Sequence, residues 1–188
     1  PLISYRVGKE PAGIIWTDLN LDGRIDLVTA NQGSGDLSIL YGKSAGNFAQ
    51  EERISVEGVP ISLGSGDFDG DGRPDIAVGE CLLGDSAILI LYGDREGAFV
   101  RRSTHFAGKI LSAIVPFDIN GDGRLDFVAS DFGGDRVLVL LAAEGGHFRN
   151  PIQLPVGNGP VCLRVTDIDQ DGFVDIVTAN RYSGDVTI

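Results

Sequence analysis

Short apolar runs separated by polar, glycine-rich segments recur along the whole chain of 188 residues. The most regular run begins at an aspartate and occupies residues 26–30, 75–79, 126–130 and 175–179. A second apolar run precedes it at 13–16, 61–63, 113–115 and 161–163, and a third follows at 37–41, 87–92 and 137–141. These runs are too short for buried helices and rich in Val, Ile and Leu, so they predict β-strands.

A more polar fourth segment follows Phe48, Phe99 and Phe148. Four antiparallel strands in each repeat are typical of a β-propeller blade, with the polar fourth strand at the outer edge. We therefore expect an all-β fold, with residues 1–188 forming a single β-propeller region. The expected blades span about 8–56, 57–106 and 107–156, followed by an incomplete blade at 157–188.

A nine-residue motif lies between the first and second apolar runs of each repeat. It has Asp at positions one, five and nine, Asp or Asn at position three, and Gly at position six. The first aspartates of the copies are 49, 51 and 49 residues apart, in step with the strand pattern. Positions one, three, five, seven and nine are Asp18, Asn20, Asp22, Arg24 and Asp26; Asp67, Asp69, Asp71, Arg73 and Asp75; Asp118, Asn120, Asp122, Arg124 and Asp126; Asp167, Asp169, Asp171, Phe173 and Asp175.

This donor set predicts a calcium site in each loop, up to four in all. Ca²⁺ takes six to eight oxygen ligands in a tolerant geometry. Short side chains at positions one, three and five can turn inward, the position-seven carbonyl can coordinate, and the position-nine Asp can close the shell. The loops contain no His or Cys, which argues against zinc, and a cage of protein carboxylates suits calcium better than magnesium.

Two other interpretations of the motif remain open. An EF-hand or dockerin loop begins similarly, but it requires a closing Glu at position twelve and flanking helices. The loops could instead be metal-free Asx turns, although clustered carboxylates repel one another without a cation. Among the loops, the first is the strongest candidate for an empty site, because it has Leu21 at position four and only three acids.

The net charge of −12 is concentrated in these motifs, which hold 14 of the 27 acidic residues. No basic stripe is present to neutralise phosphates, which argues against a nucleic-acid partner. No apolar run reaches the roughly 18 residues of a membrane-spanning helix. The two cysteines, Cys81 and Cys162, occupy non-equivalent positions, and we expect them to be free, buried thiols.

The repeated D-x-[DN]-x-D-G-x-x-D loop, with the strands before and after it, closely resembles the FG-GAP and VCBS repeats of integrin-like β-propellers. The resemblance covers essentially the whole chain. It implies that each loop joins the first two strands of a blade and holds Ca²⁺. Leu21 and Gln170 depart from the family at position four, where Gly is usual, and this affects the expected loop geometry more than the ligand set.

Residues 1–8 match 151–157, which predicts that residues 1–7 are the outer strand of a neighbouring blade. The chain stops partway through a third strand of its last repeat. The leading interpretation is a segment of a larger ring. The alternatives are a ring completed by a homo-oligomer, or a four-bladed ring closed by pairing the two termini.

The resemblance favours a non-catalytic binding or adhesion module for a protein or carbohydrate ligand, in an extracellular, cell-surface or periplasmic setting where calcium is abundant. On the face opposite the loops, the candidate ligand-binding residues are Asn31, Glu80, Asp131, Asn180, Arg181 and Tyr182. These residues could equally be ordinary polar turn residues, and Trp16 is expected to pack between blades.

A structural scaffold within a larger secreted protein is the first functional alternative. A carbohydrate-active enzyme is the second, and it receives little support because His105 and His147 are non-equivalent and no known catalytic motif occurs.

Overall fold

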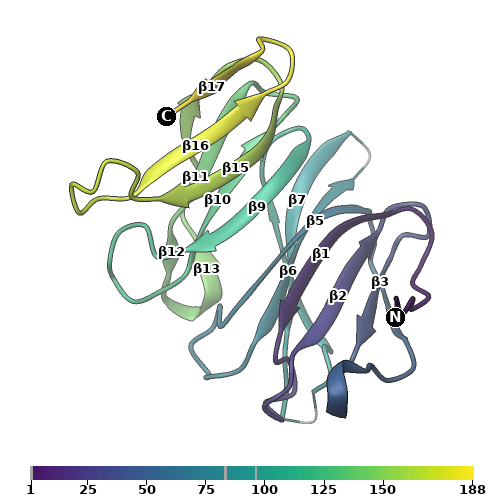
Figure 1. Cartoon of the computed structure of the whole chain (residues 1–188). Helices are drawn as coiled ribbons and strands as arrows, with labels where there is room; N and C mark the ends of the chain where they lie inside the picture. Colours follow the sequence, from purple (N-terminus) through teal and green to yellow (C-terminus); the bar gives the residue numbers. More distant parts are fainter. Residues whose placement is uncertain (1, 83, 96) are drawn as a thin grey trace.

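The computed structural model describes residues 2–82, 84–95 and 97–188. The chain forms successive antiparallel sheets that are arranged as the four blades of a β-propeller (Figure 1). Blade 1 contains β1 (Pro11–Thr17), β2 (Asp26–Asn31), β3 (Asp36–Leu40) and β4 (Glu52–Ser55). Blade 2 contains β5 (Val59–Gly66), β6 (Asp75–Leu82), β7 (Asp85–Tyr92) and β8 (Arg101–Phe106).

Blade 3 contains β9 (Leu111–Phe117), β10 (Asp126–Asp131), β11 (Arg136–Leu140) and β14 (Ile152–Pro155). The short strands β12 (Ala142–Ala143) and β13 (His147–Phe148) pair with each other beside this blade. Blade 4 contains β15 (Pro160–Thr166), β16 (Asp175–Asn180) and β17 (Asp185–Thr187). Among the described residues, the helical elements are two single 3₁₀ turns, η1 (Ser44–Gly46) and η2 (Glu144–Gly146). The all-β propeller prediction is confirmed, and no helix long and apolar enough to cross a bilayer occurs in the part of the chain that the structure describes.

In the two middle blades, the second strand sends alternate side chains to opposite neighbouring blades, because successive residues of a strand face opposite sides of the sheet. In β6 of blade 2, Ile76 belongs to the apolar cluster between blades 1 and 2, whereas Ala77 belongs to the cluster between blades 2 and 3. In β10, Phe127 packs toward blade 2 and Val128 packs toward blade 4. The core therefore consists of separate layers between consecutive blades, and β1, β5, β9 and β15 contact one another in that order.

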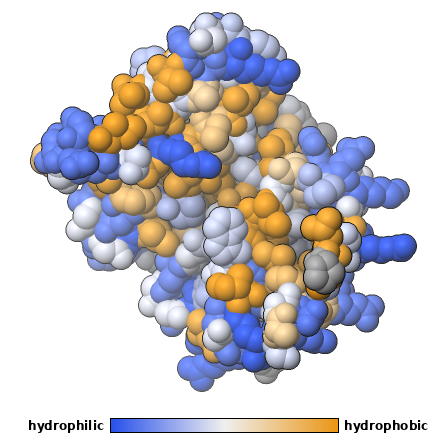
Figure 2. Space-filling model, viewed as in Figure 1, coloured by the Kyte–Doolittle hydropathy of each residue, from blue (hydrophilic) through white to orange (hydrophobic). Residues whose placement is uncertain are grey.

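The outward faces of the first and last blades carry exposed apolar side chains. On blade 1, Ile15 packs toward blade 2 but its neighbour Trp16 is 70% exposed, so the expectation that Trp16 packs between blades is wrong for this structure. On blade 4, Val186 and Ile188 are exposed, and hydrophobic side chains gather over this blade at the upper left of Figure 2. A larger ring, or a ring completed by a second copy, stays a prediction.

The N-terminal segment lies against blade 1. The Gly8 amide donates to Ser38 Oγ at 3.1 Å, and the Tyr5 ring packs edge-on against Phe48 with centroids 5.3 Å apart. Residues 2–7 form no strand, and residue 1 lies outside the described residues, so their assignment to the outer strand of a neighbouring blade is not observed. Within the described residues, no strand from this segment pairs with β17, and the termini do not close a four-bladed ring.

The cysteines are both free, as expected. Their environment differs from the expectation of buried thiols, because Cys162 is exposed and Cys81 is only partly buried.

Candidate metal centres

The four Asp motifs occupy the turn between the first and second strands of each blade. Loop 1 (18–26) joins β1 to β2, loop 2 (67–75) joins β5 to β6, loop 3 (118–126) joins β9 to β10, and loop 4 (167–175) joins β15 to β16. Because each blade repeats the same strand order, the loops lie at equivalent ends of the blades. Strands flank all four loops, so the EF-hand interpretation, which requires flanking helices, does not apply.

The position-one aspartate organises each loop by accepting hydrogen bonds from its backbone. Asp18 Oδ1 accepts from the Asp22 amide at 3.0 Å, and Oδ2 accepts from the Gly23 amide at 2.8 Å. Asp118 makes the same two contacts in loop 3, at 3.0 and 2.8 Å. The backbone amides of positions five and six thereby hold the position-one carboxylate in these two loops.

Positions four and six adopt left-handed backbone conformations in every loop. At position six, φ is between +82° and +91°, and the residue is always Gly. At position four, Gly70 and Gly121 have positive φ, and so do Leu21 (φ +57°) and Gln170 (φ +62°). The departures from Gly therefore keep the loop geometry, although residues with a Cβ adopt this conformation less readily than Gly.

The position-nine aspartate fastens each of the first three loops to its blade. Asp26, Asp75 and Asp126 are completely buried. In loop 3, Asp126 Oδ2 accepts from the Ile119 amide at 3.1 Å, and Oδ1 accepts from the Ala142 amide, just beyond β11, at 2.7 Å. Loops 1 and 2 repeat this bridge, which the sequence pattern did not reveal. The position-nine side chain is thus a structural tie as well as a candidate ligand.

Burial also changes the acidity of this group in loop 2. Burial raises the pKa of Asp75 to about 6, and hydrogen bonds from the Phe68 and Gly93 amides offset part of that rise. A nearby cation would favour the charged carboxylate. The buried Asp75 carboxylate is therefore well suited to a site that holds positive charge.

Arginine side chains compensate the acids in the first three loops. The position-seven arginine pairs with the position-five aspartate, with N–O distances of 2.7 Å for Arg24–Asp22, 3.2 Å for Arg73–Asp71 and 2.6 Å for Arg124–Asp122. In loop 3, the Arg124 backbone amide and then the Asn120 side chain, both donating to Asp122, are the chief causes that lower the pKa of this carboxyl. Loop 4 has Phe173 at position seven, and its side chain is 76% exposed.

The carboxylates of two loops converge closely enough to share an ion. In loop 2, oxygens of Asp67, Asp69 and Asp71 lie within 4.8 Å of one another, and the same holds for Asp167, Asp169 and Asp175 in loop 4. Asp167 Oδ1 is buried without a hydrogen-bond partner. A buried carboxylate oxygen without a donor is unfavourable, so a cation would satisfy it. The residues of loops 2 and 4 therefore fit a hard divalent metal ion. Loops 1 and 3 have Asn at position three and form no such group of three acids among the described residues.

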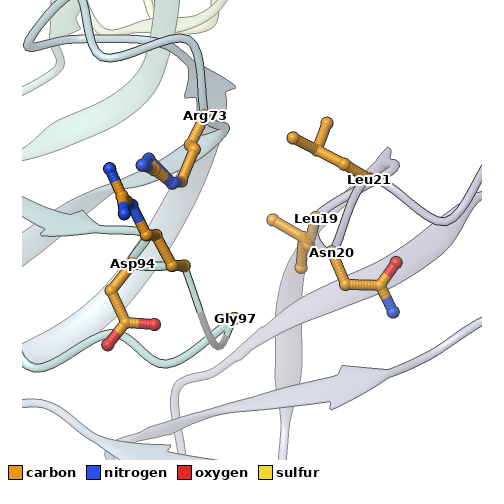
Figure 3. Close-up of a pocket in the computed structure, with 7 residues that line it drawn as sticks. Leu19, Asn20, Leu21, Arg73, Asp94 and Gly97 are labelled. Atoms are coloured by element: carbon orange, nitrogen blue, oxygen red, sulfur yellow. The ribbon is translucent and has the colours of Figure 1, made fainter.

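A cleft separates loop 1 from blade 2 on this end of the molecule. Figure 3 shows Leu19, Asn20 and Leu21 on one side, with Arg73 and Asp94 on the other. The volume of this cleft is about 300 Å³. A second pocket of about 450 Å³, lined by Asp69, Asp71 and Arg101 among others, adjoins it through Arg73. Loop 2 thus borders a solvent-accessible space on two sides.

Four of the six residues expected on the opposite face are buried within their blades. Asn31 Nδ2 donates to Asp36 Oδ1 and Ser38 Oγ, both at 2.8 Å. Asn180 repeats this arrangement with Asp185 and Thr187, at 2.8 and 2.9 Å. These asparagines tie the second strand to the third.

Glu80 and Asp131 occupy the equivalent position and are also buried. Glu80 accepts from the Gly58 amide at 3.1 Å, and burial raises its pKa. Asp131 accepts from the Lys109 and Ile110 amides at 2.9 and 3.1 Å and forms an ion pair with Arg136 Nε at 2.9 Å. All four side chains therefore have structural partners. A ligand-binding face stays a prediction, and Arg181 and Tyr182 are its exposed members.

Arg101, whose guanidinium pairs with the Asp69 carboxylate of loop 2, belongs to no sequence motif. Arg101 lies in β8, far from the motif in sequence. Only the register between β7 and β8, which sets Arg101 opposite Tyr92, brings it to the loop.

Comparison with known proteins agrees with this architecture. The chain is 31% identical to mouse (Mus musculus) integrin alpha-7 over 173 residues, which cover 85% of this chain and 14% of that protein. It is 24% identical to chicken (Gallus gallus) integrin alpha-V over 196 residues, covering 93% and 19%. It is also 29% identical to rat (Rattus norvegicus) phosphatidylinositol-glycan-specific phospholipase D over 192 residues, covering 79% and 22%. The chain therefore spans less than a quarter of the length of each relative.

Among solved structures, BBS1N in its complex with ARL6DN superimposes with a TM-score of 0.63 at 18% identity. The match covers 96% of this chain and 53% of that one, and at this identity it supports the fold alone. The family profile described as the FG-GAP-like repeat matches residues 18–78, 67–129 and 118–178. Each match begins at the first aspartate of one loop and extends past the last aspartate of the next. The chain belongs to the FG-GAP-like repeat family.

Proposed function

We propose that this chain is a calcium-stabilised, non-catalytic binding module of the adhesion type that works outside the cell. The observation that carries the metal assignment is loop 4, where three carboxylates converge and Asp167 Oδ1 is buried without a partner. Loop 2 has the same acids, and loops 1 and 3 offer the same positions with one amide in place of a carboxylate. Calcium suits this set because it accepts many oxygen ligands in variable geometry.

The metal would act on stability and not on chemistry. Bound Ca²⁺ would neutralise the clustered carboxylates and hold the turn between the first two strands of each blade. The chain itself supplies the position-nine ties and the backbone amides that shape each loop. Loops of this type in extracellular modules bind with Kd of about 10⁻⁴ to 10⁻³ M, which fits millimolar calcium outside cells.

Thermal unfolding with calcium, magnesium or excess chelator tests the metal assignment. We expect calcium to raise the Tm more than magnesium does, and chelator to lower it. A Tm that is the same in excess chelator and in millimolar calcium would refute the assignment.

The adhesion role rests on the relatives named integrin alpha-7 and alpha-V. A protein ligand is the leading candidate, and a carbohydrate ligand is the alternative. Arg181 and Tyr182 are exposed, and the Tyr182 ring lies 5.4 Å from that of Phe132, so this corner presents a hydrogen-bonding group beside an aromatic pair. Binding of the chain to immobilised extracellular-matrix proteins and to a glycan array would separate the two ligand classes. If neither class binds, the chain acts as a scaffold within a larger protein.

An enzymatic role is the second candidate because one relative is named a phospholipase D. The nearest arrangement to a nucleophile and base is Ser103, whose hydroxyl lies 3.1 Å from His105 Nε2. The His105 ring packs edge-on against Phe148, and in the described residues no carboxylate is hydrogen-bonded to it. A nucleophile of this kind normally needs an oriented base. Hydrolysis of a phosphatidylinositol-glycan substrate that is abolished by Ser103→Ala would reverse this conclusion.

A further inference from the structure

Loops 2 and 4 form a natural matched pair. Both have aspartate at positions one, three, five and nine, so their acidic ligands are the same. They differ in the positive charges around them. Loop 2 has Arg73 at position seven and Arg101 reaching in from β8, whereas loop 4 has Phe173 at position seven.

Arg101 is positioned by its strand and by an aromatic ring. It stands opposite Tyr92 in the β7–β8 register, and its guanidinium carbon lies 3.8 Å from the centre of the Tyr92 ring. The same guanidinium pairs with the Asp69 carboxylate, whose side chain is only 16% exposed. Asp69 belongs to the group of loop 2 carboxylates that converge within 4.8 Å. The Arg101 guanidinium therefore already pairs with an Asp69 oxygen that would be a ligand of the metal ion.

This arrangement does not recur in the other blades with a described fourth strand. In blade 1, the residue opposite Tyr41 is the uncharged Ala49, whose amide donates to Tyr41 O at 2.7 Å. In blade 3, the residue opposite Leu141 is Arg149, whose amide donates to Leu141 O at 2.9 Å. Leu141 offers no aromatic ring to the Arg149 guanidinium, and the ion pair of loop 3 among the described residues is the one between Arg124 and Asp122.

We propose that Arg101 is a tethered counter-cation of loop 2 that competes with calcium for the Asp69 carboxylate. This inference rests on the proposed calcium function. Binding of Ca²⁺ at loop 2 must weaken the Arg101–Asp69 ion pair and place two like charges near each other, and neither penalty exists at loop 4. Loop 2 therefore fills at a higher calcium concentration than loop 4, although their acids are identical. The chain becomes a graded calcium sensor instead of a set of equal sites.

The test is a calcium titration of the full chain followed by NMR, using the amides of Gly72 and Gly172 as reporters. These amides donate to Asp67 Oδ2 and Asp167 Oδ2 at 2.8 and 3.0 Å, so each reports on its own loop. The variant is Arg101→Gln. The matched control is Arg102→Gln, which removes the same charge from the next residue of β8, where the arginine donates to Ser55 O at 2.9 Å instead of to loop 2.

In the unmodified chain, we expect Gly72 to respond at a higher calcium concentration than Gly172. Arg101→Gln should lower the Gly72 midpoint by roughly fivefold, the upper range for an exposed ion pair, and leave the Gly172 midpoint in place. Arg102→Gln should leave both midpoints nearly unchanged. An unchanged Gly72 midpoint in Arg101→Gln, or an equal shift in Arg102→Gln, would overturn the role of Arg101 while leaving the calcium sites intact. If neither amide responds to calcium, the calcium function itself is wrong and the inference fails with it.

Discussion

The position-nine aspartates should stabilise the protein even when no metal is bound, and Asp126 gives the sharpest test. Its side chain is completely buried, and its two oxygens accept hydrogen bonds from the amides of Ile119 and Ala142. Asp122, in the same loop, is exposed and accepts hydrogen bonds from within the loop. Replacing either residue with asparagine removes one carboxylate from the same candidate site.

The two substitutions should differ in chelator because they affect different contacts. A buried amide that loses its acceptor destabilises a protein by about 1–3 kcal/mol. Asparagine at position 126 keeps one oxygen acceptor but turns an NH₂ group toward the other amide, so Asp126→Asn should cost roughly 1–3 kcal/mol. Asp126→Ala, which removes both acceptors, should cost roughly twice that. Asp122→Asn should stay within about 0.5 kcal/mol, as is usual for an exposed site.

Urea unfolding in excess chelator, followed by far-UV circular dichroism, measures these differences. The same urea unfolding in millimolar calcium should show a further loss of unfolding free energy in both variants, because each has lost one carboxylate ligand of the candidate calcium site. If Asp122→Asn and Asp126→Asn are equally stable in chelator, the position-nine residue is a metal ligand without an independent structural role. That result would refute the reasoning.

Three further predictions concern the core, buried charge and the loop backbone. Phe127 is completely buried between the rings of Phe68 and Phe148, so Phe127→Ala should lower the unfolding free energy by about 3–5 kcal/mol in urea titrations, whereas the exposed Phe173→Ala should have little effect. Burial raises the pKa of Glu80 above its ordinary value of 4.5, so the folded protein keeps this proton to higher pH than the unfolded protein does, and stability should fall as pH rises from that value through the folded pKa. Glu80→Gln should flatten this decline in urea titrations across the same pH range, and an unaltered pH profile would show that Glu80 is not its source. At Gly123, φ is +84° and an added Cβ would meet open space, so Gly123→Ala should cost roughly 1–2 kcal/mol from backbone conformation alone, and a neutral effect on the Tm would argue against the left-handed conformation.

The sequence predicted the repeated parts of the fold well because they depend on local patterns. The second strand begins at the position-nine aspartate in every blade, as the apolar runs indicated. In blades 2 and 3 its alternating side chains reach two different core layers, as a short, continuous apolar run suggests.

The polar ends of these strands were harder to interpret because their neighbours are distant in sequence. Asn31 resembles an exposed turn residue until the third strand places Asp36 and Ser38 beside its amide. Glu80 and Asp131 are also buried, but they accept hydrogen bonds from backbone amides just before the first strand of the blade, Gly58 for Glu80 and Lys109 and Ile110 for Asp131. A strand end that faces the next strand is shielded by that strand, and periodicity within one strand cannot report this shielding.

The hydrogen bonds within the loops also determine what calcium can contribute. In this structure the position-one and position-nine carboxylates are already held by backbone amides, as with Asp18 and Asp26 in loop 1. Calcium would therefore bind largely preformed loops, unlike a metal that creates the fold on binding. When the free calcium concentration is ten times the Kd of a site, binding at that site raises the free energy of unfolding by about 1.4 kcal/mol. Four independent sites would together raise it by roughly four times that amount. Removal of calcium should accordingly lower the Tm of a chain that stays folded, and a chain that loses its β-sheet circular dichroism at room temperature in chelator would show that the loops need the metal to form.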